Sequence, residues 1–250
     1  MSATEPAEAR ARRGGPGRPL RVGHKGAAHI APGNSLESFQ AALEAGVDMI
    51  EFDVLSERID GRGRLMLAHD YEELRSGGSL TLEEGLVHLA SSPYDGVTLD
   101  VDIKLPGYGG RVVEALRETG LLKRSLVSCT YPEELDRIRA LEPSLPLGWS
   151  IPRARRDYTT SAWTVGPALA ALWFWRRVMP ARAQRALATG RFDAVMAHWR
   201  LVTPALVRAV ASGAGELYVW TVDDEQQMRR LAALGVDGII SNDPRLFEAI

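Results

Sequence analysis

The sequence predicts a single (β/α)8 TIM barrel. Strand-like and helix-like segments alternate about eight times from residue 20 to the C-terminus, which is the pattern of parallel βαβ units. The chain has 250 residues, a length typical of one such barrel. A similar joint also recurs near both ends, at 45–50 and 234–239, where a glycine ends a helix and an apolar strand follows.

Each expected strand is a short apolar segment bounded by turn-forming or charged residues. The strands are expected at 20–23, 47–54, 65–68, 97–103, 125–128, 145–151, 192–197, 217–222 and 236–240. Helices are expected at 36–45, from 81, and at 110–119, 132–141, 204–211, 224–234 and 244–250. Asn34 or Ser35 is placed to cap the first helix, and Gly46 to end it. Thr81 and Glu84 form a capping pattern, while Pro132 suits a first helical turn.

One region interrupts this alternation, an enlarged apolar loop and helix at about 153–190. Its segment 158–175 has no charged side chain, includes three tryptophans and is followed by Arg176 and Arg177. A transmembrane span is one interpretation, which the polar start and the Gly-Pro break of the segment disfavour. A buried barrel helix with an enlarged loop is the second. A flap that contacts lipid is the third, because tryptophan beside arginine suits the headgroup region of a membrane.

Charge and cysteine content narrow the class of protein. The formal net charge is −2, so no basic field attracts nucleic acid and no nucleic-acid partner is expected. Cys129 is the only cysteine, which excludes an intrachain disulfide and favours a cytoplasmic location, with membrane association if the flap contacts lipid. Residues 1–19 lack the apolar segment of a secretory signal and are predicted to be a flexible tail before one barrel domain at 20–250.

Acidic side chains recur at expected strand ends. Glu51 and Asp53 alternate along one strand and therefore face the same way, as do Asp100, Asp102 and Lys104 along another. Carboxylates directed into one barrel mouth repel each other, and a hard cation such as Mg²⁺ or Ca²⁺ relieves that repulsion. We therefore expect Glu51, Asp53 and Asp102 to hold a divalent cation. The alternative is a set of solvated charges at loop ends.

Two histidines accompany these carboxylates. His24 and His69 each follow an expected strand, and imidazole is the side chain best able to exchange a proton near neutral pH. One can take a proton from an attacking hydroxyl while the other gives one to a leaving oxygen. A purely structural role is the alternative. His29 and His88 lack such neighbours, and His198 is only a weak candidate for lining the site.

Three further residues are expected to bind substrate. Lys25 and Lys104 would face the anionic oxygens of a phosphate as point charges, although each taken alone is equally compatible with a solvated surface lysine. Trp220, at the end of a late strand, would form a wall of the substrate site or pack in the core.

Seven short motifs occur in a fixed order from residue 20 onward. They are His24-Lys25-Gly26-Ala27, Pro32-Gly33-Asn34-Ser35, Ile50-Glu51-Phe52-Asp53-Val54, His69-Asp70, Asp102-Ile103-Lys104, Val219-Trp220-Thr221-Val222 and Gly235-Val236-Asp237-Gly238-Ile239-Ile240. This ordered set resembles the glycerophosphodiester phosphodiesterase family of metal-dependent TIM-barrel enzymes. The resemblance implies cleavage of a glycerophosphodiester into sn-glycerol 3-phosphate and an alcohol. It also implies that His24 and His69 act as acid and base, and that a substrate hydroxyl attacks phosphorus to give a cyclic phosphate that water opens.

The chain departs from the family pattern at four positions. Lys25 replaces an arginine and loses its bidentate fork. Gly33 and Asn242 each stand where the family carries a carboxylate, and Asp102 is one methylene shorter than the usual glutamate. These changes leave an active site expected, with altered substrate geometry or metal affinity.

Two other functions remain as alternatives. The apolar segment 162–175 favours a lysophospholipase D-like activity on long-chain lysophospholipids, with peripheral membrane contact. The substitutions at Lys25 and Asp102 favour a barrel that binds phosphodiesters without turnover. No feature of the sequence indicates an oligomeric state.

Overall fold

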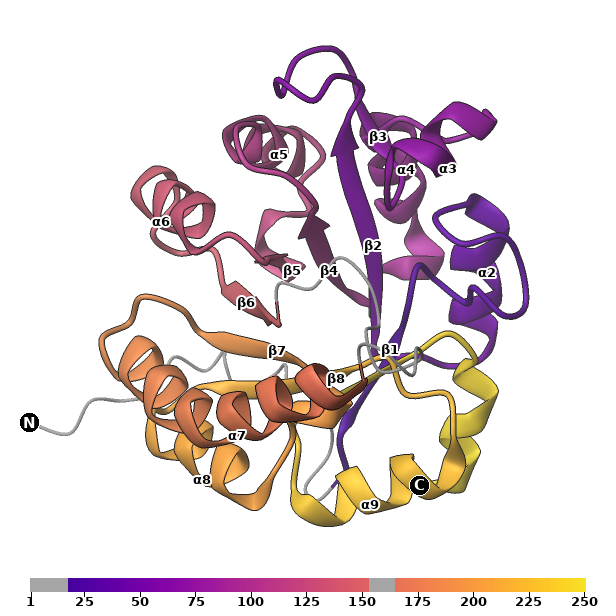
Figure 1. The fold of residues 1–250 in the computed structure, drawn as a ribbon. Coiled ribbons are helices and arrows are strands. Elements are labelled where there is room, and N and C mark those ends of the chain that lie inside the picture. The colour runs from indigo at the N-terminus through magenta and orange to yellow at the C-terminus, as the bar shows by residue number, and fades with distance from the viewer. Residues whose placement is uncertain (1–17, 153–164) are drawn as a thin grey trace, which may run out of the picture.

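The computed structural model describes residues 18–152 and 165–250 (Figure 1). Residues 1–17 of the expected tail at 1–19 therefore lie outside the described residues. Residues 153–164 of the expected insertion at 153–190 also lie outside them. No helix in the described part of the chain is long and apolar enough to cross a membrane.

A closed barrel of parallel strands forms the centre of the molecule, as predicted. In order along the chain its strands are β1 (Leu20–Gly23), β2 (Met49–Ser56), β4 (Thr98–Ile103), β5 (Ser125–Cys129), β6 (Leu147–Ile151), β7 (Ala194–His198), β8 (Glu216–Trp220) and β9 (Gly238–Ser241). The ring closes because β1 pairs in parallel with both β2 and β9. This closure confirms the predicted TIM barrel.

Helices surround the ring of strands (Figure 1). They are α2 (Leu36–Glu44), α3 (Tyr71–Ser76), α4 (Leu82–Leu89), α5 (Gly109–Glu118), α6 (Pro132–Leu141), α7 (Val165–Ala188), α8 (Pro204–Ser212) and α9 (Glu225–Leu234), with short 3-10 turns η1 (Ser92–Tyr94), η2 (Leu122–Arg124), η3 (Trp199–Leu201) and η4 (Pro244–Ala249). Ser35, not Asn34, caps α2, in a reciprocal box with Ser38. Thr81 and Glu84 form the predicted capping box of α4.

Four local differences from the expected elements appear, and the first two arise from strand pairing that short apolar patterns do not specify. β3 (Leu65–Leu67) runs antiparallel to the end of β2 and lies outside the parallel ring. That pairing extends β2 to Ser56, beyond the expected end at Val54. The helix α3 was not expected, and the closing helix at 244–250 is the 3-10 turn η4.

The barrel interior is apolar at its base and polar above. A compact cluster fills the base, formed by Leu20, Val22, Met49, Leu126, Ala194, Met196, Tyr218 and Ile240. A larger apolar core lies between the strands and the helices and includes Phe39, Phe52, Ile138 and Leu206. Because side chains alternate along a strand, Met49 in the base lies below Glu51 and Asp53 on the same face of β2. The base therefore closes the floor beneath the acidic residues.

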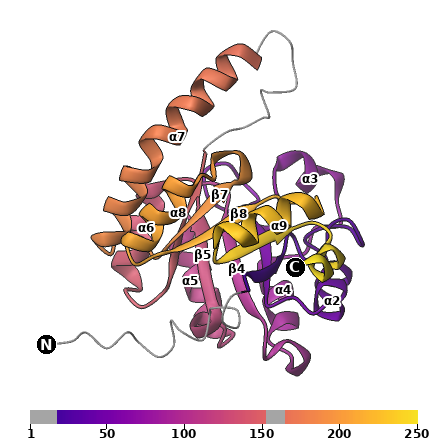
Figure 2. The same cartoon turned by 90° about the horizontal axis from the view of Figure 1, so that it is seen from below.

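The long helix α7 follows the segment that is not described. Its C-terminal half carries the buried residues Met179, Ala183 and Leu187, spaced four apart on one face, and this half packs beside α8. Figure 2 shows that its N-terminal end projects away from the barrel.

Candidate active site

The register of β2 and β4 sets four carboxyl groups side by side. Glu51 lies opposite Asp100, and Asp53 lies opposite Asp102, across the parallel ladder. All four alternate in the same phase, so they share the inner face of the barrel. Glu51 and Asp53 lie within β2, two and four residues after its start, because β3 prolongs the strand beyond them.

Three of these groups form a compact cluster. Glu51, Asp53 and Asp102 each offer a carboxylate oxygen, and the three oxygens lie within 4.8 Å of one another. Glu51 and Asp53 are buried. Burial, and after it repulsion from the Asp53 carboxylate, raise the pKa of Glu51 well above its usual value. A buried set of hard oxygen donors under mutual repulsion fits a cation such as Mg²⁺ or Ca²⁺.

The Lys104 ammonium lies between two members of this cluster. Its Nζ is 2.5 Å from Asp53 Oδ1 and 2.6 Å from Asp102 Oδ2. Burial alone would lower the pKa of Lys104, but the carboxylates of Asp102 and Asp53 outweigh burial and hold that pKa well above its usual value. Lys104 is thus a fixed positive charge among the acids, and Ser128 supports Asp102 from the next strand with a 3.3 Å hydrogen bond.

Lys25 contributes a second positive charge from the loop after β1. Its backbone N–H donates to Glu51 Oε2 at 2.8 Å, and its Nζ lies 3.4 Å from Asp53 Oδ2. A Cβ placed on Gly33 would lie 3.0 Å from Lys25 Cβ and 3.1 Å from its Cδ. Lys25 and Gly33, two of the residues that depart from the family pattern, are therefore neighbours in space. The aliphatic part of the Lys25 side chain leaves little room for a larger side chain at residue 33.

The backbone of this loop demands glycine at residue 26. Gly26 has φ +82°, and a Cβ there would lie 2.6 Å from the carbonyl carbon of Ser38. The Ser38 hydroxyl also donates to the Lys25 carbonyl at 2.8 Å. The start of α2 thus holds the loop that carries His24 and Lys25.

Asn34 positions the central carboxylate. Its side-chain N–H donates to Asp53 Oδ2 at 3.1 Å, and its side-chain oxygen accepts the Asp53 backbone N–H at 3.0 Å. The residue is buried and has φ +59°, a conformation that asparagine tolerates better than most residues. The sequence marks Asn34 as a candidate cap and as part of a family motif, whereas its contact with Asp53 depends on the tertiary fold.

His24 is held through its Nδ1 atom. Nδ1 lies 2.6 Å from Asn242 Oδ1, while the Asn242 side-chain N–H donates to Asp223 Oδ2 at 2.7 Å. Nε2, on the other side of the ring, lies 3.8 Å from Glu51 Oε2. Burial is the largest influence on the pKa of His24 and lowers it, against the opposing effects of Asp53 and Asn242. The imidazole is therefore largely neutral at pH 7.

His69 is held more loosely, at the start of α3. Its Nδ1 lies 3.3 Å from Asp70 Oδ2, and its backbone N–H donates to Glu73 Oε2 at 3.1 Å. Glu73 also accepts a hydrogen bond from Asn34 at 3.4 Å. Burial would raise the pKa of Asp53, but Lys104 and then Lys25 lower it, with smaller contributions from the nearby imidazoles of His69 and His24. The structure thus brings His24 and His69 to one acidic cluster.

Trp220 ends β8 and is half-buried. Its indole N–H donates to the Met196 carbonyl at 3.0 Å, and the ring meets His198 edge-on, with centroids 5.0 Å apart. It packs against the apolar base of the barrel. Trp220 therefore packs against the core at the carboxyl end of a strand, and its expected role as a wall of the substrate site stays a prediction.

Asp100 is a buried acid that the sequence interpretation left without a role. It is 1% exposed, and its Oδ1 has no hydrogen-bond partner in the described part of the protein. Burial, and then Asp102, raise its pKa to about 8, so the group is largely protonated at neutral pH. Its neutral form limits the negative charge under the cluster. The alternation of Asp100 with Asp102 and Lys104 was the signal that could have found it.

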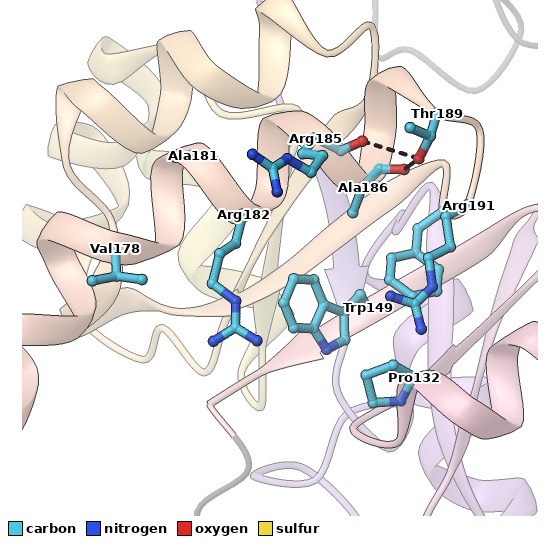
Figure 3. A pocket seen from close by; sticks show the side chains of 10 residues that line it. Pro132, Trp149, Val178, Ala181, Arg182, Arg185, Ala186, Thr189 and Arg191 are labelled. Atoms are coloured by element: carbon cyan, nitrogen blue, oxygen red, sulfur yellow. Dashed lines mark hydrogen bonds between the residues drawn. The ribbon is translucent and has the colours of Figure 1, made fainter.

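A separate cavity of about 470 Å³ lies outside the barrel, between α6, β6 and α7. Trp149 and Phe192 contribute apolar surface, and Figure 3 shows Trp149 between Arg182 and Arg191. None of the expected catalytic or metal-binding residues lines it. The cavity is therefore distinct from the acidic cluster.

The fold and the cluster define a TIM-barrel enzyme with its site at the carboxyl ends of the strands. The sequence model of the glycerophosphoryl diester phosphodiesterase family matches residues 24–79 and 105–246. The glycerophosphodiester phosphodiesterase of Caldanaerobacter subterraneus subsp. tengcongensis is 24% identical over 259 residues, which cover 90% of this chain and 94% of that protein. Because the family match spans most of the sequence, the chain belongs to the glycerophosphoryl diester phosphodiesterase family and is a phosphoric diester hydrolase.

Solved structures share the whole fold. A Silicibacter pomeroyi structure described as a glycerophosphoryl diester phosphodiesterase superposes with a TM-score of 0.74 at 22% identity, over 97% of this chain and 96% of that one. An Oleispira antarctica phosphodiesterase, solved in complex with the product sn-glycerol-3-phosphate, gives 0.68 at 20% identity, over 93% and 96%. At identities of 22% and 20%, the similarity to these two structures is evidence for a shared fold only.

Proposed function

We propose that the chain hydrolyses glycerophosphodiesters to sn-glycerol 3-phosphate and an alcohol at the cluster of Glu51, Asp53 and Asp102. The observation that carries this proposal is the meeting of those three carboxylates within 4.8 Å, with His24 Nε2 3.8 Å from Glu51. The product complex of the Oleispira antarctica phosphodiesterase supports this substrate class.

Glu51, Asp53 and Asp102 are the residues that would hold the divalent cation, Mg²⁺ or Ca²⁺. When bound, the cation would supply positive charge for the phosphoryl oxygens and reduce repulsion among the carboxylates. Lys25 and Lys104 lie beside the same cluster and add two fixed positive charges. Together these charges favour an anionic diester and the further negative charge of its transition state.

His24 is the proposed base. Its Nδ1–H donates to Asn242, so Nε2 keeps a free lone pair and accepts the proton of the attacking glycerol hydroxyl. The hydroxyl oxygen forms a bond to phosphorus as the bond to the alcohol oxygen breaks. His69, half-exposed beside Asp70, gives the departing oxygen its proton. Water then opens the resulting cyclic phosphate with the two proton transfers reversed.

The test is release of sn-glycerol 3-phosphate from glycerophosphocholine with Mg²⁺, Ca²⁺ or EDTA. We expect cation-dependent release in the wild type and at least a 100-fold lower kcat in His24→Ala. His88→Ala is the matched control, because His88 bonds Tyr94 in another part of the fold. Release that is unaffected by EDTA, or by loss of His24, would contradict the proposed site. Turnover of any kind excludes the binding-only alternative.

Long-chain lysophospholipids are a second candidate substrate class. The observation in their favour is the exposed apolar surface on the N-terminal half of α7, which includes Trp173 and Phe174. Parallel assays on glycerophosphocholine and on 1-palmitoyl-lysophosphatidylcholine separate the two classes. A kcat/KM at least tenfold higher for the acylated substrate would assign the lysophospholipase D-like activity.

A further inference from the structure

The N-terminal half of α7 projects past the catalytic face of the barrel. Arg176 Nε donates to the carbonyl of Arg200 at 2.8 Å, and Arg200 belongs to η3, which directly follows the carboxyl end of β7. Arg176 is therefore level with the rim of the barrel. The part of α7 that precedes it extends beyond that rim, as Figure 2 shows.

This projecting part exposes large apolar side chains. Leu169, Trp173 and Phe174 are 53%, 60% and 52% exposed, although residues of these types are usually buried. Leu172 and Trp175 pack against the core, so the helix is anchored along one face and open along another. Tryptophan and phenylalanine on an open helix face are typical of segments that enter the boundary between lipid headgroups and acyl chains.

All the charged side chains of α7 are positive. The helix contains Arg176, Arg177, Arg182 and Arg185 and no acidic residue. None of the four forms an ion pair with another described residue of the chain, and Arg177 stacks on Trp173 with its guanidinium carbon 4.2 Å from the ring centroid. Unpaired arginine beside exposed tryptophan complements a surface of negative charge over an apolar layer.

The same side of the helix leads from the aromatic end to the outer cavity. Phe174, Val178, Arg182 and Arg185 follow at spacings of four, four and three residues and therefore lie along one side. Val178, Arg182 and Arg185 line the cavity, whose wall includes Trp149 and Phe192 (Figure 3). The pairing of apolar surface with arginine thus continues from Phe174 into this cavity.

We propose that α7 docks the enzyme on membranes that contain anionic phospholipid. Trp173 and Phe174 enter the headgroup boundary, Arg177 beside them faces lipid phosphates, and Arg182 and Arg185 add positive charge further along the helix. Docking at this end sets the catalytic face toward the membrane. This inference goes beyond the proposed hydrolysis, and its test needs neither substrate nor turnover.

The test is flotation of the full chain with vesicles in EDTA, without substrate. We expect binding to vesicles of phosphatidylglycerol and phosphatidylcholine at low salt, at least tenfold weaker binding to phosphatidylcholine alone, and loss of binding in high salt. Trp173→Ser with Phe174→Ser, and Arg182→Gln with Arg185→Gln, should each lower the partition coefficient at least tenfold. Circular dichroism and thermal unfolding establish that each variant is folded.

Val87→Ser with Leu141→Ser is the control, because both residues are exposed apolar side chains on other helices, α4 and α6. Arg62→Gln with Arg230→Gln is the control for charge. Wild-type protein that stays unbound with anionic vesicles overturns the proposal. So does equal binding to neutral vesicles, or binding by the folded α7 variants as strong as that of the wild type. Because activity plays no part in the readout, failure here leaves the proposed hydrolysis untouched.

Discussion

The Nδ1 atom of His24 lies 2.6 Å from the side-chain oxygen of Asn242, across 218 residues of sequence. Asp223 fixes the orientation of the Asn242 amide, because the Asn242 side-chain N–H donates to it at 2.7 Å. The amide oxygen therefore faces His24, which must donate from Nδ1. These two contacts fix the tautomer of the neutral imidazole, with its lone pair on Nε2.

Asn242→Asp should move the acidic limb of activity to higher pH. Burial first of all lowers the pKa of His24, so the neutral base persists below pH 6.5 in the wild type. A carboxylate beside Nδ1 favours the imidazolium and raises that pKa. Activity would then be lost at a higher pH as the medium is acidified. The pH dependence of kcat/KM measures the shift, and an unchanged acidic limb in a folded variant would contradict this role of Asn242.

Lys104→Met should destabilise the metal-free protein and increase its response to cations. The change removes the ammonium 2.5 Å from Asp53 and 2.6 Å from Asp102. It leaves the buried Asp53 and the partly buried Asp102 without that partner, at a cost of about 3 kcal/mol in the free energy of unfolding. Added Mg²⁺ or Ca²⁺ should raise Tm more in this variant than in the wild type. Lys123→Met, at an exposed lysine, is the control. Equal Tm shifts in the variant and the wild type would place the cation elsewhere.

Gly26→Ala should cost far more stability than Gly46→Ala. Both glycines have positive φ, +82° and +70°, and an alanine pays about 1 kcal/mol for that conformation. A Cβ at Gly46 meets nothing within 4 Å, whereas one at Gly26 meets Ser38 at 2.6 Å. We expect a loss of about 3 kcal/mol at Gly26. Urea unfolding of the two variants gives the difference, and similar losses would show that the close approach to α2 is unimportant.

Asn34→Ala should weaken both stability and cation binding. It leaves the buried Asp53 without two hydrogen bonds, including the one to its backbone N–H, which costs about 1–3 kcal/mol. Calorimetric titration with Mg²⁺ or Ca²⁺ would show the weaker affinity. Gln40→Ala, on the exposed side of α2, is the control. Unchanged affinity in a folded Asn34 variant would show that Asp53 is positioned without this contact.

Cys129 should be unreactive in the native protein. Burial raises the pKa of its thiol far above the usual value, and the thiol bonds the Ile103 carbonyl at 3.0 Å. Labelling by a disulfide reagent at pH 8 should be about 100-fold slower in buffer than in denaturant. Fast labelling of the native protein would mean that β5 opens readily.

The parts of the fold that the sequence predicted are those governed by local pattern. The strands that carry Glu51, Asp53 and Asp102 were found because apolar periodicity and alternation need only neighbouring residues. The capping roles of Thr81 and Glu84 were found for the same reason. The extension of β2 was missed because it depends on β3, a three-residue strand too short to show its direction.

Contacts between distant segments explain what the sequence left open at the site. Asn242 was seen as a lost carboxylate, whereas the structure retains one close by, in Asp223 behind it. The role of Asn34 was hidden because its partner Asp53 is 19 residues away on another element. Glu73 lies on α3, which buries none of its residues. Apolar spacing therefore predicted neither this helix nor the position of Glu73.

The position of His69 has a consequence for how motion accompanies turnover. Its neighbour Asp70 is also the cap of α3, accepting the backbone N–H groups of Glu72 and Glu73, both at 2.9 Å. Because α3 buries none of its residues, these hydrogen bonds are a main source of its order. In the proposed mechanism, each change of charge on His69 would alter its attraction for Asp70, and we expect the fraying of α3 to change with it. Amide hydrogen exchange at Glu72 and Glu73 would measure that fraying.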